Sequence, residues 1–168
     1  MKGSLMMNIR YEKMDAWQDQ ARTFFKDHWQ TDTMVVSSGE YRLADLNGIV
    51  AVTETNEVVG LVTYTVHGNA MEIVSLNSVE PNQGIGTKLM AAAEARAQAT
   101  GLTKMVTTTT NDNLAAMRFY QKHGYRFAKV IRGSVDTART LKPTVPEIGN
   151  DGIPIHDELL MNKDLPRL

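Results

Sequence analysis

The stretch Glu80-Pro81-Asn82-Gln83-Gly84-Ile85-Gly86-Thr87-Lys88-Leu89-Met90 decides the fold of this chain. The apolar segment before it predicts a strand, and the alanine-rich segment after it predicts a helix. The loop between them would leave free backbone N–H groups at the helix N-terminus, where the helix dipole favours a phosphate. Gly84 and Gly86 would let the backbone approach that phosphate closely. A tight turn without a ligand is the alternative, because a Gly-x-Gly pattern alone is only a hypothesis.

A dinucleotide-binding fold fits this stretch poorly. The third glycine of the Gly-x-Gly-x-x-Gly pattern would fall at Leu89, where the pattern requires glycine or alanine. The next predicted strand, over residues 102–110, also contains no acidic residue that could hold a ribose. A nucleotide-binding protein of the Rossmann type is therefore a weak alternative.

A second motif follows after roughly thirty residues, at Asn111-Asp112-Asn113-Leu114-Ala115-Ala116-Met117-Arg118-Phe119-Tyr120-Gln121-Lys122-His123-Gly124-Tyr125. Here the chain resembles the GNAT superfamily of N-acetyltransferases. The Gly84–Gly86 loop resembles the acyl-CoA pyrophosphate loop of that superfamily, and Asn113-x-x-Ala116, Tyr120 and Gly124-Tyr125 resemble its second signature. The resemblance extends from about Met7 to Lys163, which is nearly the whole chain.

Composition sets the broad class. A length of 168 residues predicts one domain over 1–168, and a chain of this size can bury a sufficient core without disulfides. The methionines at 6 and 7 suggest that residues 1–6 are an expression remnant or disordered. Net charge is −1 and the pI is about 6.4, so no basic nucleic-acid footprint is expected. The absence of cysteine, of a signal peptide and of a long apolar run favours a cytoplasmic protein with no membrane partner.

The hydrophobic pattern predicts a mixed α/β fold. Strands are expected over 7–11, 48–55, 58–67, 71–79, 102–110, 125–132 and 155–162, and helices over 16–29, 87–99 and 134–141, with a further helix that follows Asp112 and ends at Gly124. Asp15 and Asp112 are the expected N-caps of the first and third helices. Residues 31–46 and 142–152 are expected to be irregular. Strands 71–79 and 102–110 should form a central parallel pair in a mostly antiparallel sheet flanked by helices, as in the GNAT acyl-CoA N-acyltransferase fold.

The resemblance implies acetyl-CoA as co-substrate. Its pyrophosphate would bind Gln83, Gly84, Ile85, Gly86 and Thr87. The family has Gln or Arg three residues before the first glycine, where this chain has Pro81, so a charged side-chain contact is missing from the pattern. Lys88 would supplement the loop or be an ordinary exposed lysine.

The resemblance also places the pantetheine arm of the cofactor along one strand. The contacting residues would be Leu76, Asn77, Ser78 and Val79, through backbone groups, together with Asn113 and Ala116. Asn113 would contact the arm, form a hydrogen bond at the helix start, or do both.

Transfer to an amine requires a base and an acid. An alkyl ammonium with a pKa near 10.4 must lose a proton, and the departing thiolate benefits from a proton donor. Tyr120 matches the family tyrosine near the CoA sulfur, although a core aromatic is the alternative. Glu72 is the candidate base, with an exposed structural carboxylate or a water chain as alternatives. His67, His156 and Glu158 are weaker candidates. The four histidines show no metal-ligand spacing, so no metal is expected.

The predicted function is an N-acetyltransferase that moves the acetyl group of acetyl-CoA to a primary amine by direct attack in a ternary complex. No cysteine could carry an acyl-enzyme. The acceptor would be a small molecule or a peptide, contacted by Trp29, Tyr41 and Arg42 and covered by the segment 139–152. The alternative is a non-catalytic acyl-CoA sensor or scaffold. The resemblance also allows a homodimer, since many proteins of this family are dimers.

Overall fold

The computed structural model describes residues 8–80 and 83–168. The interpretation of residues 1–6 and the comparison made at Pro81 lie outside the described residues.

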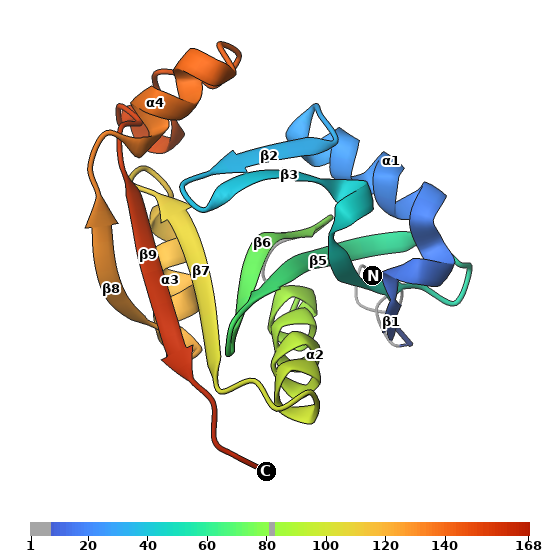
Figure 1. Cartoon of the computed structure of the whole chain (residues 1–168). Helices are drawn as coiled ribbons and strands as arrows, with labels where there is room; N and C mark the ends of the chain where they lie inside the picture. The colour runs from blue at the N-terminus through green and yellow to red at the C-terminus, as the bar shows by residue number, and fades with distance from the viewer. Residues whose placement is uncertain (1–7, 81–82) are drawn as a thin grey trace.

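Seven strands form one sheet in the order β1-β4-β5-β6-β7-β9-β8, and two more form a separate hairpin (Figure 1). The strands are β1 Arg10–Lys13, β2 Thr33–Val36, β3 Gly39–Arg42, β4 Asn47–Val52, β5 Val58–His67, β6 Ala70–Ser78, β7 Lys104–Thr110, β8 Arg126–Ile131 and β9 Glu158–Asp164. Among the described strands, β6 and β7 make the only parallel pair. The predicted mixed, mostly antiparallel sheet with a central parallel pair is confirmed.

Helices cover both faces of the sheet. They are α1 Gln18–Trp29, α2 Ile85–Ala99, α3 Leu114–Lys122 and α4 Ser134–Leu141. Successive residues of β4 and β5 point to opposite faces, so Ile49 and Val62 join a core under α2, while Val50 and Leu61 join a second core under α1. The strand alternation therefore divides the apolar residues between two layers of helix.

The structure corrects both predicted N-caps. A short 3-10 helix, Met14–Trp17, contains Asp15, and α1 begins only at Gln18 without a side-chain cap. At α3 the cap is Asn113, whose side chain accepts a hydrogen bond from the Ala116 N–H at 3.0 Å. Asp112 is instead buried and accepts hydrogen bonds from the backbone and side chain of Asn150. Its carboxylate anchors a distant loop rather than the helix.

The expectation of an irregular segment over residues 31–46 is wrong. This segment contains the β2–β3 hairpin and a short 3-10 helix, Leu43–Asp45. The hairpin extends from the α1 side of the molecule toward the ends of β7 and β9 (Figure 1). Its turn residue Ser37 donates a backbone hydrogen bond to Glu158 of β9, and Lys142 after α4 donates to the Thr33 carbonyl. Contacts distant in sequence therefore hold the hairpin across the sheet.

Strands β6 and β7 separate part-way along their length. They pair only from Ala70 with Lys104 to Ile73 with Thr107. Beyond that point β7 continues with β9 as far as Thr110, while β6 continues with β5 as far as Ser78. An irregularity in the β5–β6 register at Thr63 and Tyr64 accompanies the change. Within the described chain, one edge of β6 over residues 74–78 is therefore free to pair with another extended molecule.

Candidate active site

A pocket of about 360 Å³ lies where the free end of β6 meets the N-terminus of α2 and one face of α3. Its lining is formed by Leu76, Asn77, Ser78, Glu80, Gln83, Gly84, Ile85, Gly86, Thr87, Ala115, Ala116, Phe119 and Tyr120. The structure thus brings most of the predicted cofactor residues together. Val79, Lys88 and Asn113 do not belong to this lining.

The N-terminus of α2 presents backbone donors that have no acceptor among residues 8–80 and 83–168. Gly84 is its N-cap, with a left-handed φ of 78°, and the Lys88 N–H makes the first helical bond to the Gly84 carbonyl. The preceding N–H groups, of Ile85, Gly86 and Thr87, have no helical acceptor. A Cβ at Gly84 would meet no atom of the described residues within 4 Å, so none of them crowds the loop at this position. A pyrophosphate fits such a position, since it is anionic and accepts several hydrogen bonds.

The free edge of β6 presents a second set of backbone groups. The Val79 N–H donates to the Val59 carbonyl of β5 at 2.9 Å. Because the groups of successive residues alternate in direction, those of Asn77 also face β5, whereas those of Leu76 and Ser78 face the open edge. Leu76 and Ser78 can therefore pair with an amide-bearing arm, and the Val79 N–H is already occupied.

The side chains of Lys88 and Asn113 lie beside the pocket rather than in its wall. Lys88 is exposed on α2. Asn113 uses its side-chain oxygen as the α3 cap, so the predicted helix-start hydrogen bond is confirmed. His123 of α3 approaches the α2 terminus too, with Nε2 3.0 Å from the Thr87 hydroxyl.

Tyr120 lines the pocket and is also part of the core. Its side chain is 7% exposed and packs edge-on against Phe119 and Tyr125. Burial raises the pKa of the phenol, and a hydrogen bond with the Thr107 side chain partly opposes that rise. A buried phenol with a raised pKa keeps its proton at neutral pH, as a proton donor must.

Glu72 is buried under the β2–β3 hairpin, so the alternative of an exposed carboxylate is wrong. Its carboxylate accepts hydrogen bonds from Ser38 at 2.7 Å and from the Tyr41 hydroxyl at 3.3 Å. His67 Nε2 lies 2.8 Å from the same group, and its side chain is 54% exposed against 6% for Glu72. The carboxylate is thus held by three side chains, of which His67 reaches solvent.

The remaining predicted candidates occupy separate places. Glu158 is buried, and burial together with the nearby Glu72 charge raises its pKa. His156 lies near the surface and contacts the Asp136 carboxylate at 3.0 Å. Trp29, at the end of α1, donates its indole N–H to the Asn77 side chain. Arg42 is exposed at the end of β3.

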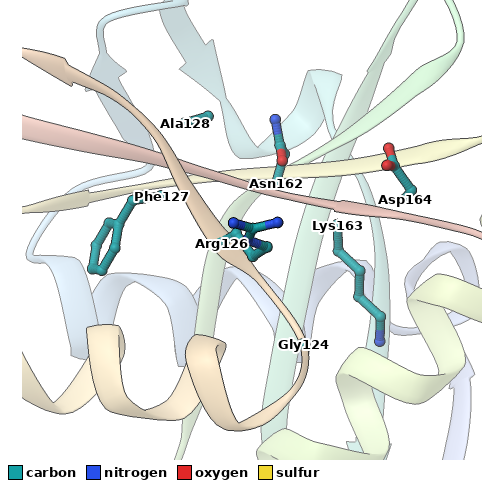
Figure 2. Close-up of a pocket in the computed structure, with 7 residues that line it drawn as sticks. All are labelled: Gly124, Arg126, Phe127, Ala128, Asn162, Lys163 and Asp164. Carbon is teal, nitrogen blue, oxygen red and sulfur yellow. The ribbon is translucent and has the colours of Figure 1, made fainter.

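A second pocket, of about 290 Å³, lies at the β8 edge of the sheet, between β8 and β9 (Figure 2). Figure 2 shows Lys163 and Asn162 projecting to opposite sides of β9. Lys163 is bound to Glu94 at 3.1 Å, and Asp164 is 3.6 Å from Lys104. The charges on its β9 wall are thus engaged with other residues, and the pocket shares no lining residue with the first.

Sequence reasoning missed the contributions of the hairpin turn and of the aromatic ring at Phe119. Ser38 contacts Glu72, and Phe119 lines the pocket beside Gly86. The short apolar, β-branched run Met34-Val35-Val36 followed by the turn residues Ser37-Ser38-Gly39 is typical of a hairpin, and this signal could have located Ser38.

The sequence pattern of the acetyltransferase (GNAT) family matches residues 13–125. The chain therefore belongs to this family. It is 46% identical over 140 residues to uncharacterized protein YdhI of Bacillus subtilis, covering 83% of this chain and 88% of YdhI. Uncharacterized protein YxbD of the same organism is 43% identical over 148 residues, covering 88% and 93%.

Solved structures share the fold at low sequence identity. A Bacillus subtilis acetyltransferase in complex with CoA superposes with a TM-score of 0.67 at 19% identity, covering 95% of this chain and 100% of that one. A GNAT family acetyltransferase from Elizabethkingia anophelis with acetyl-CoA bound superposes with a TM-score of 0.68 at 21% identity, covering 95% and 99%. No helix in residues 8–80 or 83–168 is long and apolar enough to cross a bilayer.

Proposed function

We propose that this protein is an acetyl-CoA-dependent N-acetyltransferase that acetylates a primary amine of a small molecule or peptide. The observation that carries the proposal is the meeting of three features in one pocket. These are free N–H groups at the α2 terminus, a free β6 edge and the buried Tyr120 phenol. Together they suit the pyrophosphate, the amide-bearing arm and the sulfur of acetyl-CoA. Neighbours of the same fold that hold CoA or acetyl-CoA support this assignment.

The two candidate catalytic groups flank the point where β6 and β7 separate. Glu72 of β6 is in register with Val106 of β7. Tyr120 lies beside Thr107, which follows Val106 and is the last residue of β7 that pairs with β6. Glu72 points toward the hairpin, whereas Tyr120 belongs to the core under α2. An acceptor amine would thus approach from the hairpin side and meet the thioester in the opening.

The reaction is a direct transfer. Glu72, alone or through a water chain, accepts a proton from the acceptor amine, whose nitrogen forms a bond to the thioester carbonyl carbon. The carbon–sulfur bond then breaks, and Tyr120 donates its phenolic proton to the departing thiolate. The second proton, which the new amide nitrogen still carries, passes to the Tyr120 phenolate directly or through water and restores the phenol. General acid and base catalysis of this kind contributes roughly 10²–10⁴-fold for each group. The segment 139–152 would cover the acceptor, since Lys142 already contacts the hairpin.

The test is a thermal shift with acetyl-CoA and, in parallel, NAD, followed by an amine panel in which free CoA is measured. At a concentration about 100 times its dissociation constant, acetyl-CoA should raise the free energy of unfolding by roughly 2.7 kcal/mol. The midpoint temperature of thermal unfolding should then rise by about 2–4 °C for each kcal/mol of added stability. A shift with NAD alone would favour the nucleotide-binding alternative, and binding without turnover on any amine would favour an acyl-CoA sensor.

The Gly86→Asp variant locates the pyrophosphate. A Cβ at Gly86 would lie 3.5 Å from the Phe119 ring, an ordinary contact, so the fold should tolerate a side chain there. The added carboxylate would repel the pyrophosphate, and we expect binding of acetyl-CoA to be lost. Ala95→Asp adds the same charge to an exposed position of α2 and should bind normally. Tight binding by Gly86→Asp would mean that the pyrophosphate lies elsewhere.

A further inference from the structure

The side-chain amide of Asn77 has a fixed orientation. Trp29 Nε1 lies 2.8 Å from Asn77 Oδ1. An indole N–H can only donate, and the nitrogen of a side-chain amide cannot accept. The amide oxygen must therefore face Trp29, and the amide nitrogen must face away from it.

The amide nitrogen of Asn77 has no acceptor in the part of the chain that the structure describes. No hydrogen bond from Nδ2 occurs within residues 8–80 and 83–168. Over the same residues, every buried side-chain nitrogen or oxygen has a partner, so Nδ2 is not a buried, unpaired donor but opens to free space. Asn77 lines the pocket between Leu76 and Ser78, whose backbone groups face the open edge of β6. A residue of the pocket wall thus carries a neutral side-chain donor that has no acceptor in the described chain.

We propose that Asn77 Nδ2 donates a hydrogen bond to a carbonyl oxygen of bound acyl-pantetheine, and that Trp29 is the residue that positions it. The inference rests on the proposed acyl-CoA function. Carbonyl oxygens are the neutral acceptors that such an arm offers, in its amides and in its thioester. A strand edge alone offers backbone donors at every second residue, and Asn77 adds a side-chain donor at the residue whose backbone groups face β5.

Two substitutions at Asn77 test the donor. Asn77→Asp keeps an oxygen for Trp29 but removes both N–H groups, and Asn77→Ala removes the donor without adding charge. We expect the acetyl-CoA dissociation constant to rise about fivefold in both, which corresponds to a loss of about 1 kcal/mol, the typical net contribution of one hydrogen bond. Asn69→Asp, in the exposed β5–β6 turn, is the matched control and should bind as the unmodified chain does. Weakening by Asn77→Asp alone would indicate charge repulsion and would overturn the proposal.

Comparison of acetyl-CoA with CoA identifies the oxygen. If Nδ2 bonds to the thioester carbonyl, the substitutions weaken the binding of acetyl-CoA and leave the binding of CoA unchanged. If it meets an amide carbonyl of the arm, both ligands weaken equally. Unchanged affinity for both, in a protein that binds acetyl-CoA, would overturn the proposal while leaving the proposed function intact. Failure of the unmodified chain to bind either ligand would overturn both.

Trp29→Phe tests the positioning role. This change keeps an aromatic ring but removes the indole N–H, so the Asn77 amide is free to rotate. We expect a several-fold loss of affinity, and no further loss when Trp29→Phe is combined with Asn77→Asp, since Trp29 acts through Asn77. The Asn77 side-chain amide signals should also shift on adding acetyl-CoA, and less so in Trp29→Phe. Additive losses would show that Trp29 only stabilises the fold and would overturn its positioning role.

Discussion

Tyr120 packs in the core and is also the proposed acid, and substitution can separate the two. Tyr120→Phe keeps the ring in its core position and removes the proton that burial retains on the phenol. We expect kcat to fall by about 10²–10⁴-fold while the CoA dissociation constant changes less than about twofold. Because the phenol pKa is raised above its ordinary 10.0, no loss of activity from its ionisation should occur below that pH. Tyr11→Phe, in the edge strand β1, is the control, and unchanged turnover in Tyr120→Phe would exclude Tyr120 as the acid.

Glu158 should make stability depend on pH. Its pKa is raised above the ordinary 4.5, chiefly by burial, so the folded state favours the protonated form. The contribution of Glu158 to the free energy of unfolding is fully present below about pH 4.5. This contribution is lost as the pH rises through the pKa that Glu158 has in the folded state. Glu158→Gln keeps an oxygen for the Ser37 N–H and should therefore be more stable than the unmodified chain at pH 7–8 but equal to it near pH 4. Chemical denaturation at both pH values measures this, and a difference independent of pH would contradict it.

Among individual residues, the sequence predicted which residues line the pocket better than it predicted what surrounds the catalytic candidates. Gln83 to Thr87, Leu76 and Tyr120 line one pocket as expected, because a short motif sets the geometry of the loop and of the helix that follows. The burial of Glu72 could not be predicted. Glu72 lies near a strand start, and the groups that cover it come from a turn more than thirty residues earlier in the chain.

At the scale of elements, β5 and α4 have the bounds that the sequence predicted, whereas the β2–β3 hairpin was missed. Its strands have four residues each and lie outside the main sheet. Local propensity is weak over such lengths, and contacts with Glu72, Glu158 and Lys142 hold the hairpin instead. The residues in these contacts are up to 121 positions apart in the sequence, so no local pattern can predict them.

The hairpin should matter to the acceptor rather than to the cofactor. Tyr41→Phe removes the hydroxyl that contacts Ser38, His67 and Glu72. We expect a stability loss of about 1 kcal/mol, a lower turnover and an unchanged CoA affinity, because the hydroxyl orients the carboxylate but lines no part of the pocket. Thermal melts, amine kinetics and CoA titrations measure the three effects. A loss of CoA affinity would contradict this separation.

The start of α3 combines a cap with a predicted ligand contact. Asn113→Ala removes the hydrogen bond to the Ala116 N–H and should cost about 1 kcal/mol of stability. Asn113→Asp keeps that bond but loses the amide donor, so we expect normal stability with weaker CoA binding. Melting temperature and CoA titration separate the two roles. Normal binding by Asn113→Asp would leave Asn113 as a helix cap alone.

At the scale of the whole molecule, the sheet consists of two groups of strands with a short junction. Strands β1, β4, β5 and β6 form one antiparallel group, and β7, β9 and β8 form the other. Only four residue pairs of β6 and β7 join them. The parallel pair was predictable from the strand–helix–strand order. The insertion of β9 between β7 and β8 was not, because the sequence does not state which edge a last strand will join.

This junction predicts where acetyl-CoA should reduce backbone opening. A ligand seated between β6 and α3 would bridge the two groups of strands, so protection should extend across the junction rather than remain at the contact points. We expect slower amide hydrogen exchange at Leu76 and Ser78, at the α2 start and along α3, with β1 unchanged because it lies at the far edge. Exchange measured with acetyl-CoA and with CoA, using Gly86→Asp as the non-binding control, tests this. Protection confined to the α2 terminus would mean that the ligand contacts the phosphate loop without joining the two groups of strands.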